Sequence, residues 1–166
     1  MKTKTKSLSD LIKACKFDYV NENIEKLFKT EPIRGKVEIK NFGKYMTSEA
    51  VIEELKKDGC VPANATELFH WIFENPEHLK GSYGGVVGLG SVAAFEGHRR
   101  VPLEWWCESG RDANLYWFDR EWSGYDWFAF VRESSPQTLE PKTSSPVSLD
   151  LPEFLEINGV KYQKVK

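Results

Sequence analysis

The stretch 105–132 constrains the fold of this chain more than any other segment. It carries five of the six tryptophans, and its aromatic residues are interleaved with Asn, Asp, Arg, Ser and Gly. A segment that only filled a core would be mostly aliphatic. Rings among small hydrogen-bonding residues are typical of binding surfaces, because Tyr and Trp supply contact area at low entropic cost. The stretch therefore predicts a folded scaffold that carries a recognition surface.

Length and composition set the remaining bounds. A chain of 166 residues has the size of one domain with modest appendages. Its content of 40% hydrophobic and 29% charged residues is ordinary for a globular protein. The formal net charge of −2 argues against nucleic acid and against an acidic membrane as the partner.

The expected compartment follows from the termini and the cysteines. The basic start of the chain is not followed by an apolar run of signal-peptide length, and no stretch suits membrane insertion. Three widely spaced cysteines, Cys15, Cys60 and Cys107, do not form a disulfide framework. We expect a reduced, cytoplasmic location, with leaderless or phage-type export as the alternative.

Local patterns predict an α+β fold with two well-defined helices. The first helix follows Thr47 or Ser48 as its N-cap and stops at Gly59, and the second runs over 66–75. The second helix presents an apolar face of Leu68, Phe69, Ile72 and Phe73. Short strands are expected at 36–42, 84–92, 100–106, 115–118 and 127–133, and shorter helices at 9–15 and 23–29.

The chain divides into four predicted segments: an N-terminal polar segment 1–35, a domain 36–132, a linker 133–150 rich in Pro and Ser, and a C-terminal β-hairpin 151–166. Asn158-Gly159 suits the type I′ turn of that hairpin. Because an isolated hairpin is marginal in water, it is expected to dock either on its own domain or on another chain. The second arrangement would make the protein a homo-oligomer.

Neither a cofactor nor a metal is expected. Gly88, Gly90 and Ala93 match the tail of a dinucleotide fingerprint, but no long helix follows and no βαβ repeat surrounds them. Close backbone packing is the better interpretation of these glycines. The three histidines lie in separate segments without metal-ligand spacing.

An enzymatic alternative centres on the residues around Cys107. Cys107 and His98 are nine residues apart across a predicted strand, so a thiol–imidazole pair is one hypothesis. Cysteine more often packs as a small hydrophobic residue. The enzyme alternative, a hydrolase or transferase, places its site near Cys107, Arg111 and Asp112.

The aromatic stretch separates into a core set and a surface set. Alternation along the strands assigns Leu115, Trp117, Trp122, Phe128, Phe130 and Val131 to the core. The residues left facing outward are of the types that are enriched at binding hot spots. The predicted ligand-binding residues are Asn114, Tyr116, Arg120, Ser123, Tyr125, Asp126 and Trp127.

Three motifs, in order, resemble the C-type lectin fold of the formylglycine-generating-enzyme type: CVPANATELFHWI, GLGSV and WFAFVRE. The ending GRDANLYWFDREWSGYDWFAFVR is similar to the variable region of target proteins of diversity-generating retroelements. In those proteins a lectin-like scaffold is fixed, and codons for exposed residues near the C-terminal end are rewritten. The resemblance covers residues 45–132 and implies a C-type lectin-like domain, with two helices on short, mostly antiparallel strands, that binds a ligand.

Differences between this sequence and these families limit the function that the resemblance implies. The Glu-Pro-Asn, Gln-Pro-Asp and Trp-Asn-Asp motifs of calcium-dependent sugar binding are absent, so a protein is favoured over a sugar as the unknown ligand. Formylglycine generation uses a cysteine pair, and Cys107 stands alone in the C-terminal part, so the chain is expected to be non-catalytic. The variable region commonly ends such chains, whereas a linker and a hairpin follow here.

Overall fold

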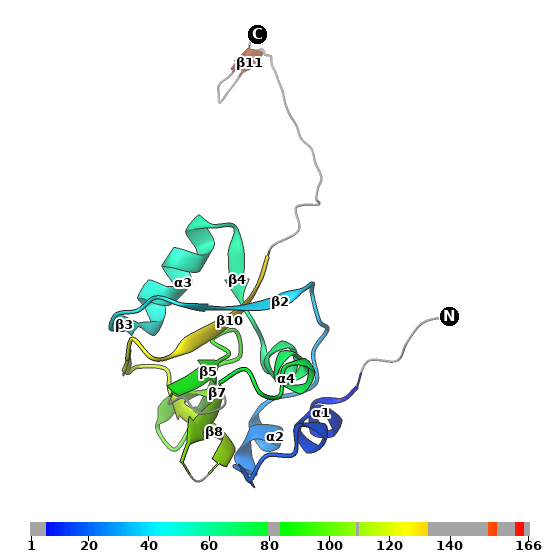
Figure 1. Cartoon of the computed structure of the whole chain (residues 1–166). Helices are drawn as coiled ribbons and strands as arrows, with labels where there is room; N and C mark the ends of the chain where they lie inside the picture. The colour runs from blue at the N-terminus through cyan, green and yellow to red at the C-terminus, as the bar shows by residue number, and fades with distance from the viewer. Residues whose placement is uncertain (1–5, 80–83, 109, 133–152, 156–161, 165–166) are drawn as a thin grey trace. The chain divides into compact units, whose positions relative to one another are not determined.

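The computed structural model describes residues 6–79, 84–108 and 110–132, together with the backbone of 153–155 and 162–164. The chain divides into two compact units, Met1–Arg132 and Glu133–Lys166 (Figure 1). In the second unit, β11 (Glu153–Leu155) pairs antiparallel with β12 (Tyr162–Lys164), as expected for a hairpin. The predicted linker and the predicted Asn158-Gly159 turn lie outside the described residues.

One mixed sheet of eight described strands organises the first unit. Its order is β1 (Tyr19–Val20), β8 (Gly110–Trp117), β7 (His98–Cys107), β5 (Gly84–Val87), β10 (Trp127–Arg132) and β2 (Val37–Asn41); β4 (Cys60–Pro62) also pairs with β10, and β6 (Ala93–Phe95) with β7. The pairings β1–β8 and β5–β10 are parallel, and the others in this sheet are antiparallel. A short ribbon of β3 (Met46–Thr47) and β9 (Glu121–Trp122) lies apart from the sheet path.

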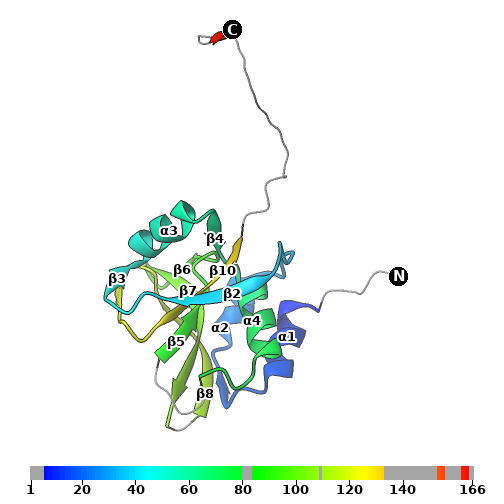
Figure 2. The ribbon, with the colours of Figure 1, turned by 45° about the horizontal axis from the view of Figure 1, so that its top comes forward.

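Helices cover both faces of the sheet (Figures 1 and 2). Side chains of α1 (Leu8–Cys15), α2 (Asn23–Leu27) and α4 (Ala65–Glu74) pack in one core cluster, with Ala129 of β10. Side chains of α3 (Ser48–Lys57) pack in a second cluster. Neighbouring residues along β10 enter opposite clusters, because successive side chains of a strand point to opposite faces. The α+β expectation is confirmed, and the four helices of the described residues correspond to the two well-defined and the two shorter helices that were predicted.

The N-terminal segment is part of the core, which corrects its description as a separate polar segment. Leu8, Leu11 and Ile12 are fully buried, and Ile24 of α2 has no exposed surface. The spacing i, i+3, i+4 places the α1 residues on one helical face, and this stripe packs against α4. The following strand, β1, extends the sheet by pairing with β8.

The two predicted helices are present with small shifts. The Thr47 side chain accepts a hydrogen bond from Ala50 N–H as the N-cap of α3, and Gly59 has φ +72° after its end. The N-cap of α4 is Asn64, so this helix starts one residue earlier than expected. Phe73 is 39% exposed, which corrects its place on the apolar face. It lies about 100° around the helix from the buried Ile72, at the margin of the stripe.

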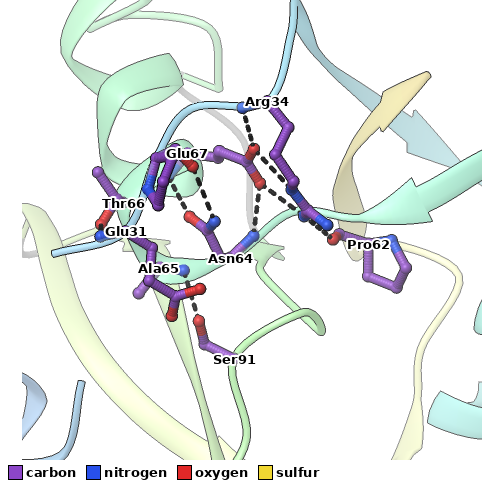
Figure 3. A network of polar contacts seen from close by, with 9 residues as sticks. Glu31, Arg34, Pro62, Asn64, Ala65, Thr66, Glu67 and Ser91 are labelled. Atoms are coloured by element: carbon purple, nitrogen blue, oxygen red, sulfur yellow. Dashed lines mark hydrogen bonds and ion pairs between the residues drawn. The ribbon is translucent and has the colours of Figure 1, made fainter. Parts of the chain in front are cut away.

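A polar network around Glu67 joins α4 to the chain that precedes β2 (Figure 3). Glu67 Oε2 accepts from Arg34 N–H at 2.7 Å and from Arg34 Nε at 3.0 Å, and Oε1 accepts from Asn64 N–H at 2.9 Å. Burial disfavours ionisation of Glu67, but the hydrogen bonds from Arg34 and Asn64 outweigh it and hold the pKa of this carboxyl below its ordinary value. The network therefore fixes the start of α4 with a buried, ionised side chain.

The glycines after β5 serve close backbone packing. Gly90 N–H donates to Ala63 C=O at 2.8 Å, and a Cβ at Gly90 would overlap the carbonyl oxygen of Pro62. Ser91 Oγ accepts from Ala65 N–H at 2.7 Å, which ties the same turn to α4. The predicted strand at 84–92 is therefore shorter, and a tight turn follows its last residue, Val87.

Candidate functional site

A pocket of about 450 Å³ lies at the end of β8, lined by Arg100, Leu115, Tyr116, Trp117 and Arg120. We call these five residues and the space between them the β8 groove. Two of the seven predicted ligand-binding residues, Tyr116 and Arg120, contribute to it. The groove thus combines two guanidinium groups with two aromatic rings on adjacent residues of one strand.

One wall of the groove is a stacked set of side chains. The Arg120 guanidinium lies 4.9 Å from the ring centroid of Tyr116 and 4.8 Å from that of Trp122. The Tyr116 and Trp122 rings are stacked, with 11° between their planes. Buried Trp122 is held by a hydrogen bond from its Nε1 to Ser48 Oγ at 2.8 Å, and that hydroxyl donates to Phe118 C=O. The wall is therefore anchored in the α3 side of the core.

The opposite wall is formed by Trp117 and Arg100. Trp117 is 47% exposed and stacks on His98 at 4.5 Å, which corrects its assignment to the core. The Arg100 guanidinium lies 5.6 Å from the Trp117 ring. Ala113 and Leu115, earlier on the same face of β8, are buried in the cluster under the helices, but that cluster does not reach Trp117. The Trp117 ring is therefore half-exposed because the helical layer ends before it.

The other residues of the predicted core behave as expected. Five of the six are buried: Leu115, Trp122, Phe128, Phe130 and Val131. The alternation inferred for β10 is confirmed, since Phe128 and Phe130 share one cluster and Val131 belongs to the other.

Asp126 and Ser123 have structural roles in a turn before β10. Asp126 is only 2% exposed, which corrects the expectation that it faces outward. Its carboxylate accepts from Gly85 N–H at 3.1 Å, from Ser123 N–H at 3.0 Å and from Ser123 Oγ at 3.2 Å. The Asp126 carboxylate therefore already accepts hydrogen bonds within the chain, at the positions where a ligand would otherwise donate.

Asn114 is also engaged within the chain. Its Oδ1 accepts from Asn21 Nδ2 at 3.0 Å and from Leu115 N–H at 2.8 Å. Asn21 N–H in turn donates to Ala113 C=O, immediately after the end of β1. The amide of Asn114 therefore closes the sheet edge next to β1, and its side chain does not line the groove.

Tyr125 and Trp127 lie apart from the groove. The sheet register places Trp127 beside Val86, then Glu104, then Ala113, four residues before Trp117 along β8. Three strand spacings and four residues amount to roughly 20 Å. Trp127 is half-buried against the core, whereas Tyr125 is 74% exposed. The seven predicted residues therefore do not form one continuous site.

Tyr125 is near a second exposed tyrosine that sequence reasoning missed. The loop at Gly43 and Lys44 packs against Gly124, where an added Cβ would lie 3.0 Å from Lys44 N. Tyr45 follows this loop and is 69% exposed. No local sequence signal distinguishes Tyr45, because it lies outside the aromatic stretch.

The residues of the enzyme alternative do not all come together. His98 and Cys107 occupy the two ends of β7, so their Cα atoms are separated by about 30 Å along an extended strand. Arg111 is turned inward, where its Nη1 donates to Glu104 Oε2 at 3.0 Å and its Nη2 to Cys15 C=O. Asp112 lies opposite Trp105 in the β7–β8 register, so it points to the face of Cys107 and away from Arg111.

In the described parts of the chain, no group of three or more His, Cys, Asp and Glu side chains is placed to hold a metal ion. None of the helices in the same residues is both long enough and apolar enough to span a membrane. Comparison with known proteins gave no match to a protein family, to a curated protein or to a solved structure.

Sequence reasoning missed three groove residues as binding residues: Arg100, Leu115 and Trp117. Arg100 belongs to the polar start of β7, His98-Arg99-Arg100, so no local sequence signal distinguishes it from its neighbours. Trp117 was assigned to the core instead, because it lies two residues after the buried Leu115 and so shares its face of the strand.

Proposed function

We propose that this chain is a non-catalytic ligand-binding module with a C-type lectin-like scaffold, and that the β8 groove is the centre of its recognition surface. The observation that carries the proposal is the pairing of Arg100 and Arg120 with the partly exposed Tyr116 and Trp117 around one pocket. Tyr, Trp and Arg dominate binding energy at interfaces because they combine large contact area with directional polar groups.

Binding is favoured over catalysis by the chemistry of the groove. Among the described residues, its lining contains no Ser, Cys, His, Asp or Glu that could act as a nucleophile or a general base. The buried carboxylate of Glu104 and its partners His78 and Arg111 lie beneath the surface instead. An enzyme would need its reactive groups at the pocket wall.

A division between fixed and exposed residues supports diversification of the segment 112–132. Phe118, Trp122 and Asp126 are buried and hold the walls and the turn. Tyr116, Arg120 and Tyr125 are partly or fully exposed, and changing their side chains would leave the hydrogen bonds of Trp122 and Asp126 in place. Such a pattern suits a scaffold on which new ligand specificities are selected.

The genomic neighbourhood tests this proposal. We expect a reverse transcriptase and a near-repeat template of the 112–132 segment. The differences from the template should fall at codons such as Tyr116, Arg120 and Tyr125, and should spare Phe118 and Trp122. A metabolic operon without a template would favour the enzyme alternative, and differences concentrated at buried codons would contradict diversification.

A further inference from the structure

The β8 groove runs along a strand edge. Leu115, Tyr116 and Trp117 are consecutive residues, so their side chains alternate between the two faces of the sheet. A pocket that all three line must therefore pass along the outer edge of β8, since no single face of the sheet presents them together.

This part of the edge has no neighbouring strand among the described residues. β1 covers β8 only through the pairs Tyr19↔Asp112 and Val20↔Ala113. Asp18 N–H donates to Arg111 C=O and Asn21 N–H to Ala113 C=O, which shows that odd-numbered residues of β8 turn their backbone groups away from β7. The C=O of Leu115 and both backbone groups of Trp117 follow the same direction.

Two cations flank this open edge on opposite faces. Arg100 lies opposite Trp117 in the β7–β8 register and shares its face, whereas Arg120 lies over the Tyr116 ring on the other face. The nearest carboxylate to Arg100 is Glu96, 3.9 Å away, and Arg100 Nε is buried without a hydrogen-bond partner in the described structure. Arg120 has no carboxylate partner among the described residues, and its Nε makes a long contact of 3.4 Å to a backbone carbonyl.

We propose that the β8 groove binds an acidic peptide in extended conformation, which adds a strand to β8 and places two adjacent carboxylates on Arg100 and Arg120. This inference rests on the proposed function and names the ligand class of the same site. Adjacent residues of an added strand point to opposite faces, so residues i and i+1 reach the two guanidinium groups. Carboxylates at i and i+2 would both point to one face and reach only one of them.

The spacing of the acidic residues gives the test. The full chain is titrated with two fluorescent synthetic peptides of identical Thr, Val and Glu composition, one with adjacent glutamates and one with glutamates separated by a single threonine. We expect the adjacent form to bind about tenfold more tightly, because it makes one more charge-assisted ion pair. Equal affinities for the two peptides would overturn the proposal.

Variants identify the groove as the binding place. Arg100→Gln combined with Arg120→Gln should weaken the adjacent form by roughly a hundredfold, since both ion pairs are lost. The matched control, Arg132→Gln on exposed β10 surface, should leave binding unchanged. Unchanged binding in the double variant would overturn the proposal, and loss of binding on Tyr125→Ala instead would keep a recognition function while placing it elsewhere.

Backbone methylation separates strand addition from simple charge attraction. N-methylation of alternate peptide amides should abolish binding when the methylated set faces β8 and preserve it when the set faces solvent. If both methylated sets bind as well as the parent peptide, the edge pairing is wrong. Failure of every peptide to bind would also overturn the inference. The search for a near-repeat template of the 112–132 segment would still test the proposed function independently.

Discussion

Nε2 of His78 lies 2.8 Å from Oε1 of Glu104, a carboxylate with no exposed surface in the middle of β7. The other oxygen of Glu104 lies 3.0 Å from Arg111 Nη1, so one buried anion serves two basic side chains from different elements. His78 and Arg111 are also nearly buried, at 10% and 12% side-chain exposure. Arg111 reaches Glu104 across the β7–β8 hairpin, whereas His78 comes from the segment that follows α4.

Glu104→Gln should strongly destabilise the protein. It leaves Arg111 buried without its counterion, and breaking such a pair typically costs about 3–5 kcal/mol of unfolding free energy. Urea denaturation followed by tryptophan fluorescence measures the loss. Glu22→Gln, in the exposed pair with Lys26, is the control and should change stability by less than about 1 kcal/mol. Similar losses of unfolding free energy in both variants would contradict a stabilising role of the buried Glu104–Arg111 pair.

The two tryptophans around the groove should respond differently to truncation. Trp122→Ala removes a fully buried ring and is expected to cost about 3–5 kcal/mol. Trp117→Ala removes a half-exposed ring and should cost roughly 1 kcal/mol. Thermal unfolding of both variants provides the comparison, and equal shifts in melting temperature would show that Trp117 belongs to the core after all.

Glu67 should make stability depend on acid pH. Its pKa is lowered in the folded state, so its contribution is present above the unfolded pKa of about 4.3 and is lost as pH falls through the folded pKa. Glu67→Gln should therefore be less stable near neutral pH, and the difference from wild type should shrink towards about pH 3. Urea midpoints measured across this range test the sign, with exposed Glu53→Gln as the control. A difference that stays constant with pH would contradict the assignment.

The cysteines should differ in reactivity towards iodoacetamide. Burial raises the pKa of the Cys15 thiol to about 12, an effect that the nearby Arg111 only partly opposes. Almost no thiolate is then available near pH 8, whereas half-exposed Cys107 should be labelled first. Mass spectrometry of the native and urea-unfolded protein separates the sites. Rapid labelling of Cys15 in the native protein would contradict its burial under α4.

Short-range patterns predicted much of the scaffold. The cap at Thr47, the stop at Gly59 and the alternation of Phe128 and Phe130 each depend on neighbours within a few residues, and each is present. The helices at 9–15 and 23–29 were also predicted, because amphipathic spacing depends only on residues within the helix itself. Their burial was not predicted, since a short polar sequence context says nothing about which surface a helix will meet.

The sequence by itself determined the local elements and the aromatic character of the recognition stretch. Only the tertiary structure decided which of those side chains are exposed. Trp117 is exposed because the helical layer ends before it, and Asp126 is buried because Gly85 and Ser123 donate to it. Arg100 and Arg120 flank one edge because β7 and the segment after β8 meet there. Exposure depends on contacts between segments distant in the chain, and the periodicity within one segment carries no information about those contacts.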